Sequence, residues 1–480
     1  MPPASTRTLW QKSHFVRWTS EAQSNEQNVI SATGGGEPRA ERAPASGREP
    51  QAVGGPASGR APAPETRPRL LLYSIYYWPE VASTAQIYTD LCESLTDDFD
   101  VTVICAVPCY EGEIAPEYQT EPVYREEHAG VSIVRIRVPP VDKRDKLSRV
   151  RNILAFWRRA RSATRDLGGF DVVMTCSQPP ILGGMLGVFG KRATGGRLAY
   201  GIQDMNPEQT MAVGYAGGRL THRAMLALDK RSCRRADLVI TVGRDMRQTL
   251  ESRFAGGQVP RNVVINNWAD DESIRPLPKD DSGVAAFRRR YGLEGKFVVM
   301  YSGNLGLYYD LPALLDVFAE FAGEPDVAFA FVGDGAVRAD LERIATERGM
   351  KNVVFAPYQD KADLACSLAA ADVHLVCNAK GIKGVSVPSK IYGVMAAGVP
   401  VLGVLEEGSE VWRIVEESGC GILAHAGDYD EVRSALGQIL DGRERFVEAH
   451  STGREYLEAH LAREKSIAAY REVLTELAEG

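Results

Sequence analysis

Three lysines and two glycines lie close together in a stretch that could bind an anion. Lys380 and Lys383 alternate with glycines in a loop, and Lys390 follows Pro388 at the start of a small and apolar segment that we expect to be helical over 389–397. Such a loop can direct free N–H groups, the positive end of a helix dipole and a lysine charge at one phosphate. An ordinary strand–loop–helix connection with solvated lysines fits the same residues, so both interpretations stay open at this point.

The elements that position this loop form two series. In each series short apolar runs alternate with helical segments, which predicts parallel strands joined by helices. The expected strands of the first series cover 70–75, 101–105, 131–138, 171–175, 197–202, 237–242 and 263–266, and those of the second cover 297–301, 328–332, 353–355, 372–377, 401–404 and 421–423. The expected helices include 83–95, 311–321, 336–348, 409–418 and a long amphipathic helix over 459–477.

The two series predict an α/β protein with two facing Rossmann-like, doubly wound domains and a cleft between them. We expect the first domain to cover 68–270 and the second 283–458, joined by a polar, proline-containing stretch at 266–282. Residues 459–480 are expected to pack back toward the first domain. Residues 1–67 are dominated from Ala32 onward by Gly, Ala, Pro, Arg and Glu, and are expected to be a disordered extension or the product of a mis-assigned start.

Composition and charge exclude several classes of function. The net charge of −7 gives no support to nucleic-acid binding. The eight cysteines are scattered without a CxxC pair, which indicates buried thiols in a reducing compartment rather than disulfides or a zinc site. No apolar run is long enough to span a bilayer and no secretory signal opens the chain, so we expect a cytoplasmic protein.

Several motifs occur in order from Arg69 to the end of the chain. In the first series they are YYWPEVASTAQIYTDL (76–91), YGIQDMNPE (200–208) and VINNWAD (264–270). In the second they are MYSGNLG (300–306), FVGDGAVRADL (331–341), VPSKIYGVMAAGVPV (387–401) and EVWRIVEESGCG (410–421). With these motifs the chain resembles the family-four retaining glycosyltransferases of the GT-B fold, and most of all the branch that builds bacterial exopolysaccharide and O-antigen repeat units.

The resemblance implies a hexosyl or N-acetylhexosaminyl transferase of class EC 2.4. It would move a sugar, with retention of anomeric configuration, from a UDP- or GDP-linked donor in the second domain to a glycan or polyprenyl-linked acceptor in the first. It would act in cell-surface polysaccharide biosynthesis. It would need no metal ion or other cofactor, because N–H groups and basic side chains would meet the charge of the leaving diphosphate.

The resemblance also implies roles for single residues. The expected catalytic residues are Asp204 and Lys390. Donor-binding roles fall on Gly303, Asn304, Gly306, Asp334, Gly335, Lys383, Ser389 and Glu410, and acceptor-side roles fall on Glu80, Ser83 and Thr84. The residues alone leave structural alternatives open, because the glycines also fit tight turns and Asp204 and Ser83 also fit helix caps.

Two departures from the family's pattern affect these roles. A Glu-x7-Glu pair, whose second glutamate binds the donor ribose, is absent at the equivalent positions, Val385 and Gly393. Glu410 is the expected substitute and Glu417 the second choice, although both also fit solvated helical carboxylates. The loop after SGN reads LGLYYD, without the Arg and Lys of many relatives, so the lysines of the 379–390 stretch are expected to carry more of the phosphate charge.

A basic amphipathic stretch, 143–165, has nine Lys or Arg against one acid. Its apolar residues, Leu147, Val150, Leu154 and Trp157, recur at helical spacing. This pattern predicts contact with an anionic membrane surface, which would place the protein at the inner face of the plasma membrane and suit a lipid-linked acceptor. A core-facing helix with a solvated basic face fits the same pattern.

Two other functions stay open on this sequence. A nucleotide-sugar 2-epimerase has the same fold and needs no acceptor. A non-catalytic nucleotide-sugar-binding subunit would suit the missing glutamate pair. A reaction of the donor alone would reveal the first, and donor binding without turnover would reveal the second.

Overall fold

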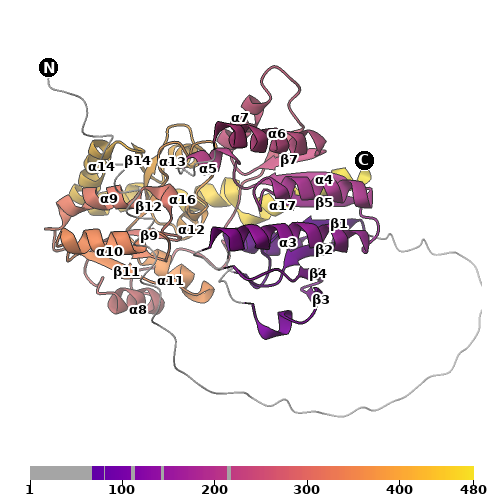
Figure 1. Ribbon diagram of the computed structural model, residues 1–480. Coiled ribbons are helices and arrows are strands. Elements are labelled where there is room, and N and C mark those ends of the chain that lie inside the picture. The colour runs from indigo at the N-terminus through magenta and orange to yellow at the C-terminus, as the bar shows by residue number, and fades with distance from the viewer. Residues whose placement is uncertain (1–66, 81, 110–113, 142–144, 213–217) are drawn as a thin grey trace, which may run out of the picture. The chain divides into compact units, whose positions relative to one another are not determined.

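The computed structural model describes residues 67–80, 82–109, 114–141, 145–212 and 218–480. Within these ranges, 67–141 and 147–480 form one compact unit that contains two β-sheets. Figure 1 shows both sheets with helices packed on them. The predicted disordered extension lies outside the described residues, except for Arg67.

The first sheet has eight strands in the order β3-β4-β2-β1-β5-β6-β7-β8. They are β1 (Arg69–Tyr73), β2 (Asp100–Ala106), β3 (Val123–His128), β4 (Val131–Ile136), β5 (Val172–Cys176), β6 (Arg197–Ile202), β7 (Leu238–Thr241) and β8 (Asn262–Val264). The connecting helices are α2 (Ser83–Ser94), α3 (Lys146–Arg165), α4 (Leu182–Thr194), α5 (Glu208–Ala212), α6 (Arg219–Arg235) and α7 (Arg244–Arg253). Every neighbouring pair is parallel except β3 and β4.

Both faces of this sheet are buried, as continuous apolar strands require. Successive side chains of a strand point to opposite faces. Leu70 and Leu72 of β1 therefore join one core cluster, to which α2 and the C-terminal helix contribute. Leu71 and Tyr73 join a second cluster, with side chains from α3 and α4.

The second sheet has six strands in the order β11-β10-β9-β12-β13-β14, and all its pairs are parallel. The strands are β9 (Phe297–Ser302), β10 (Val327–Val332), β11 (Val353–Ala356), β12 (Val373–Cys377), β13 (Val401–Leu405) and β14 (Gly421–His425). Its helices are α8 (Ser282–Arg290), α9 (Leu311–Phe318), α10 (Arg338–Glu347), α11 (Leu364–Ala369), α12 (Lys390–Ala396), α13 (Glu410–Ser418), α14 (Tyr429–Asp441), α15 (Arg443–Ala449) and α16 (Gly453–Tyr456).

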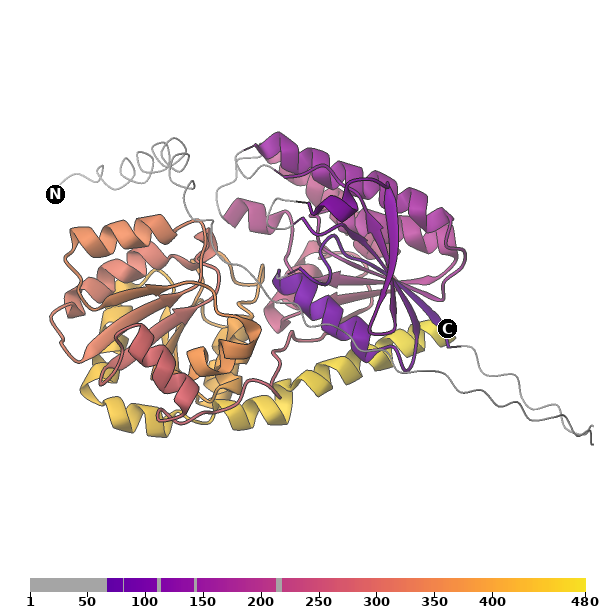
Figure 2. The ribbon, with the colours of Figure 1, turned by 90° about the horizontal axis from the view of Figure 1, so that it is seen from below.

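The chain ends in α17 (Arg463–Glu479), which packs against strands of the first sheet. Figure 2 shows this helix in yellow at the C-terminus. Its buried side chains, Ile467, Tyr470 and Leu474, belong to the core cluster of the first sheet. Arg463 adds an ion pair to Asp90 of α2, with 2.7 Å between Nη2 and Oδ1.

The prediction of two parallel α/β sheets is confirmed, and three details differ. Strand β3 was not predicted, because its Val-Tyr-Arg-Glu-Glu-His run is a polar edge strand without the apolar pattern of its neighbours. The long C-terminal helix begins at Arg463 rather than near 459, because a short π-helix (Leu457–Leu461) precedes it. The predicted helix over 336–348 covers Arg338–Glu347.

All strands of the first sheet lie within 68–270, and all strands of the second lie within 283–458, the ranges expected for the two domains. All eight cysteines are free and seven are buried, as predicted. No helix in the described ranges combines the length and apolar character needed to cross a membrane.

Candidate functional site

Lys390, the first residue of α12, is a cation held against aromatic faces. Its Nζ lies 3.7 Å from the ring centre of Tyr309 and 4.8 Å from that of Tyr301. It makes no ion pair or hydrogen bond with any residue that the structure describes. Burial lowers the pKa of Lys390 to about 8. A positive charge in this position lacks a counter-ion, so it is suited to an incoming anion.

Two glycine turns at the carboxyl ends of β9 and β10 bring backbone close to this lysine. Gly303 and Gly333 both have φ of +133°, which side chains disfavour. A methyl group on Gly333 would lie 2.1 Å from the carbonyl oxygen of Gly303, and one on Gly303 would lie 3.1 Å from Cε of Lys390. Only glycine therefore lets the Gly303 turn approach both β10 and the lysine.

Some N–H groups of the Gly303 turn donate to carbonyl oxygens of the protein, and others have no described acceptor. Those of Gly303 and Leu305 donate to the carbonyl oxygens of Val332 and Asp334. Those of Asn304 and Gly306 donate to no described residue. Of the N–H groups predicted to bind phosphate, these two are the ones available beside Lys390.

Asp334 and Gly335 shape the neighbouring turn. The Asp334 carboxylate accepts a 2.8 Å hydrogen bond from the N–H of Gly335, and the Asp334 carbonyl accepts a 3.2 Å bond from the exposed Tyr358 hydroxyl. A methyl group on Gly335 would lie 2.5 Å from the side-chain oxygen of Asn304. These contacts match the expected role of the pair in forming a turn.

Three N–H groups of the 379–389 loop donate to carboxylates of the protein itself. The N–H groups of Gly381 and Lys383 donate to Glu406 Oε2 at 2.8 and 2.9 Å, and that of Gly384 donates to Asp245 at 2.8 Å. The Lys383 ammonium group donates to the Glu407 carbonyl at 2.6 Å. The expectation that this loop presents free N–H groups to an anion is therefore wrong for these three, and a donor contact by Lys383 would require its present bond to open.

The helix expected at 389–397 is two residues shorter than predicted. Ser389 is the N-cap of α12 but its hydroxyl caps no N–H group, and the helix covers only Lys390–Ala396. The donor-binding role of Ser389 stays a prediction. Within this stretch, the Lys390 ammonium group has no described hydrogen-bond or ion-pair partner.

Asp204 follows β6 and lies beside the segment that leads to Lys390. It forms an isolated antiparallel bridge with Ser386, and the N–H of Met205 donates to the Val385 carbonyl at 2.8 Å. Burial raises the pKa of Asp204, although hydrogen bonds from Ser386 and Gln209 oppose the change. Asp204 lies in the loop between β6 and α5, so it is a loop aspartate rather than a helix cap, and its catalytic role stays a prediction.

Tyr309 connects the two expected catalytic residues. Burial, and after it the negative charge of Asp204, raise the pKa of the Tyr309 hydroxyl. The ring of the same tyrosine stacks on the Lys390 ammonium group. Asp204, Tyr309 and Lys390 thus form one polar cluster at the ends of β6, β9 and β12.

The acceptor-side residues lie after β1. Glu80 accepts a 2.7 Å hydrogen bond from the N–H of Cys109, so it holds the loop after β2 in place. Ser83 is exposed and Thr84 is half-buried in the first turn of α2, whose N-cap is Ala82. Ser83 therefore does not cap its helix, and the acceptor contacts of all three residues stay predictions.

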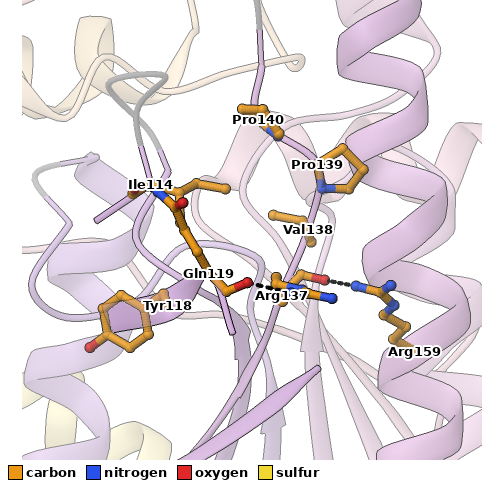
Figure 3. A pocket seen from close by; sticks show the side chains of 8 residues that line it. All are labelled: Ile114, Tyr118, Gln119, Arg137, Val138, Pro139, Pro140 and Arg159. Carbon is orange, nitrogen blue, oxygen red and sulfur yellow. Dashed lines mark hydrogen bonds between the residues drawn. The ribbon is translucent and has the colours of Figure 1, made fainter. Parts of the chain in front are cut away.

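A cavity of about 440 Å³ lies elsewhere in the first sheet's half of the chain. Figure 3 shows its lining residues, which come from the end of β4, the loop that follows, η1 (Pro116–Tyr118) and α3. They are Ile114, Tyr118, Gln119, Arg137, Val138, Pro139, Pro140 and Arg159. None of them belongs to the cluster around Lys390.

Comparison with protein families now assigns the two halves of the chain. The model for the glycosyl transferase 4-like domain matches residues 84–268, which carry strands β2 to β8 of the first sheet and Asp204. The model for glycosyl transferases group 1 matches residues 284–455, which carry the second sheet and Lys390. The chain belongs to this family of glycosyltransferases.

Two curated relatives are similar along much of this glycosyltransferase. The probable glycosyltransferase WbjE of Pseudomonas aeruginosa is 29% identical over 312 residues, covering 64% of this chain and 76% of its own length. The putative colanic acid biosynthesis glycosyl transferase WcaI of Escherichia coli is 24% identical over 419 residues, covering 84% of this chain and 98% of its own.

Solved structures show that the glycosyltransferase has the GT-B fold. Sucrose-phosphate synthase from Thermosynechococcus elongatus aligns with a TM-score of 0.68 at 16% identity, covering 86% of this chain and 99% of that one. Anabaena HepE in complex with UDP and glucose aligns with a TM-score of 0.62 at 17% identity, covering 85% and 100%. The predicted fold is thus confirmed, while the predicted cleft between the sheets stays a prediction.

Glu410, the expected ribose ligand, is engaged with the first half of the glycosyltransferase. Its side chain is 2% exposed. Its Oε2 accepts from the Arg244 N–H at 2.6 Å and from Arg244 Nε at 3.0 Å, and its Oε1 accepts from Asn266 at 3.0 Å. Glu410 therefore stabilises the start of α7, and a ribose contact would have to replace these bonds.

Glu417, the second choice, binds the same arginine. It accepts a 2.6 Å bond from Arg244 Nη1 and another from the Tyr456 hydroxyl at 2.6 Å. Glu410 is not the solvated helical carboxylate of the structural alternative, whereas Glu417 is exposed on α13 and fits it apart from these two bonds. The structure brings the two together on Arg244, and which group binds ribose stays open to experiment.

The roles of Tyr309 and Glu406 were not predicted from the sequence. The signal for Tyr309 was present, because LGLYYD places two tyrosines where many relatives have basic residues. An aromatic ring cannot neutralise phosphate, but it can hold the lysine that does. Glu406 had no local signal, since its role depends on a loop that lies about 25 residues earlier.

Proposed function

We propose that this glycosyltransferase moves a hexose or N-acetylhexosamine from a UDP- or GDP-sugar to a glycan or polyprenyl-linked acceptor, with retention of configuration, in cell-surface polysaccharide assembly. The observation that carries the proposal is the Lys390 ammonium group. It has no counter-ion among the described residues and lies between the Gly303 turn and Tyr309 in the half that matches the group 1 domain.

In the proposed reaction the acceptor oxygen bonds to the anomeric carbon while the bond from that carbon to the donor diphosphate breaks. Lys390 and the free N–H groups of Asn304 and Gly306 stabilise the charge that develops on the leaving diphosphate. The acceptor proton passes to Asp204 or to the leaving phosphate. The raised pKa of Asp204 makes it a better proton acceptor than an ordinary aspartate.

The test is calorimetric binding of UDP, GDP and their common sugar conjugates, with a Lys390→Ala variant alongside. We expect one nucleotide class to bind and the variant to lose most of that affinity. Anomeric NMR of the product from that donor then reports the stereochemistry. Equal binding by the variant would contradict the proposed donor site, and an inverted product would contradict retention.

The two alternatives predict different results in the same assay. A 2-epimerase-like enzyme would convert the donor without any acceptor. A non-catalytic subunit would bind the nucleotide and turn over no donor with any lipid-linked or glycan acceptor. The engagement of Glu410 with Arg244, which leaves no assigned ribose ligand, is the observation that keeps the second alternative in view.

Replacing Asp204 with asparagine is expected to lower the transfer rate by roughly 10²-fold and to leave nucleotide binding unchanged. The amide keeps the size of the side chain but cannot accept the proton. Because burial raises the pKa of Asp204, the acid limb of the wild-type pH–rate profile should begin above the ordinary aspartate range. The profile of the variant should lack that limb, and an unchanged limb would exclude Asp204 as the titrating group.

We also propose that transfer needs no metal ion, since Lys390 and turn N–H groups can carry the phosphate charge. EDTA at millimolar concentration is then expected to leave the initial rate unchanged. The control is a metal-dependent glycosyltransferase assayed in the same buffer. Loss of activity that Mg²⁺ or Mn²⁺ restores would overturn this part of the proposal.

We propose further that α3 contacts an anionic membrane. Leu147, Val150 and Leu154 are 64%, 51% and 44% exposed, on the helix face opposite the buried Phe156. Arg149, Arg151 and Arg158 are exposed on the same helix. Trp157, in contrast, stacks under Arg161 and packs on the core, so it does not extend the apolar row.

Substitution of Val150 and Leu154 by serine, combined with Arg151→Glu, is expected to lower binding to vesicles with 30% anionic lipid by about tenfold. Binding is measured by co-sedimentation. A matched control carries Arg343→Glu, which removes an exposed arginine from α10 of the second half. Equal losses in both proteins would point to non-specific charge effects.

A further inference from the structure

The cavity of about 440 Å³ at the end of β4 has the size and place of a ligand site. It opens where β4 ends, and the carboxyl ends of parallel strands are where such sheets bind ligands. Asn152 of α3 donates a 2.8 Å hydrogen bond to the Pro139 carbonyl and so fixes one wall. The cavity is thus built by strand, loop and helix together.

Two arginines of this cavity have only neutral partners. Arg137 donates through Nη1 to the carbonyl oxygens of Gln119 and Thr120, and Arg159 donates through Nη1 to the carbonyl of Arg137 (Figure 3). Neither forms an ion pair with a described acid. Arg135, two residues earlier, shows the contrast, because Glu126 pairs with it at 2.6 Å.

Each guanidinium group carries five N–H donors in a planar fork, and the carbonyl contacts use only one nitrogen of each. The unused donors and the two positive charges fit an anion with several oxygens and more than one negative charge. The remaining walls are mainly apolar, with Ile114, Val138, Pro139 and Pro140. A ligand that joins a phosphate group to an apolar body matches both kinds of wall.

We propose that this cavity binds the phosphate or diphosphate group of a lipid-linked acceptor. The proposal rests on the proposed function for the identity of the acceptor, but the anion site itself does not depend on it. The same helix, α3, carries Arg159 and the exposed Val150 and Leu154. Nine residues of helix separate Val150 from Arg159, which places the two on opposite faces of α3, so the anion site does not depend on the apolar row.

The experiment is calorimetric titration of the full-length protein with geranyl diphosphate, geraniol, inorganic diphosphate and glucose 1-phosphate. We expect geranyl diphosphate to bind, geraniol not to bind, and inorganic diphosphate to bind more weakly. Arg137→Gln and Arg159→Gln should each weaken geranyl diphosphate binding about tenfold or more, because each removes a charge-assisted donor set. Arg159→Lys, which keeps the charge, should recover part of the loss.

Arg158→Gln is the matched control, since it removes the same charge from the exposed neighbour on the same helix and should leave binding unchanged. Lys390→Met separates this site from the proposed donor site, because it should strongly weaken nucleotide binding and leave geranyl diphosphate binding intact. Thermal unfolding identifies any variant that fails to fold, and Arg159→Lys then carries the comparison.

Three results would overturn the proposal. Equal binding by Arg159→Gln, Arg158→Gln and wild type would show that the cavity is not the site. Loss of geranyl diphosphate binding in Lys390→Met would show that the ligand had entered the donor site instead. Glucose 1-phosphate binding as tightly as geranyl diphosphate would replace the lipid-linked acceptor by a free sugar phosphate.

Discussion

Replacement of Lys390 by methionine is expected to lower the rate of sugar transfer by roughly 10² to 10³-fold. Methionine fills similar space between the Tyr309 ring and the Gly303 turn, so the fold should survive. What is lost is the charge that stabilises the leaving diphosphate. The rate is measured with saturating donor, so that a change in affinity does not mask the change in the chemical step.

The pH dependence of donor affinity provides a second test of the role of Lys390. Burial lowers the pKa of Lys390 to about 8, so the free protein loses this charge as the pH rises above that value. A bound diphosphate stabilises the charged form and raises the pKa in the complex. Donor affinity in the wild type should therefore fall as the pH rises from about 8 toward the pKa of the complex.

The methionine variant has no group to titrate there, and its weak donor binding should stay flat over the same range. Arg343→Met serves as the control, because this exposed arginine of α10 pairs with Asp340 and Glu347 and contacts no residue of the proposed site. A wild-type affinity that does not change between pH 7 and 9.5 would exclude Lys390 as the phosphate-binding cation.

Replacement of Glu410 by alanine is expected to lower the free energy of unfolding by about 3 kcal/mol. The side chain is 2% exposed, and it accepts hydrogen bonds from the Arg244 backbone, the Arg244 side chain and Asn266. Removal leaves these donors without their partner in a buried position, and it leaves a cavity. Urea unfolding followed by far-UV circular dichroism measures the change.

Glu417→Ala removes the other carboxylate from the same arginine and is the matched control. Its side chain is 41% exposed, and exposed ion pairs contribute about 0 to 1 kcal/mol. The two variants also separate stability from ribose binding. If Glu410→Ala weakened nucleotide binding while its unfolding free energy matched the wild type, the donor role would hold and the structural role would not.

The fold was accessible from sequence because both sheets consist of continuous apolar strands with clear helical segments between them. Such runs are typical of parallel sheets buried on both faces. Strand β3 was not predicted, because it lacks such an apolar run. Three of its six residues are charged, so its identity as an edge strand depends on hydrogen bonds to β4 that no local pattern reveals.

The candidate site could be predicted from the sequence only in part. Lys390 stood out because it opens a helix after a glycine-rich loop, and the structure leaves it without a counter-ion. The neighbouring loop N–H groups looked equally available in the sequence. Their capture by Glu406 and Asp245 depends on carboxylates that are distant in the chain, and spacing cannot predict such contacts.

The contact between Asp204 and Ser386 includes a bridge between their backbones, and this has a consequence for exchanging parts between related enzymes. Peptide groups pair in the same way whatever side chains they carry. A chimera that joins the first half of this chain to the second half of a relative should therefore keep the spacing between Asp204 and the relative's equivalent of Lys390. This holds if, in the relative, the residue that pairs with Asp204 lies four positions before the lysine, as Ser386 lies before Lys390 here.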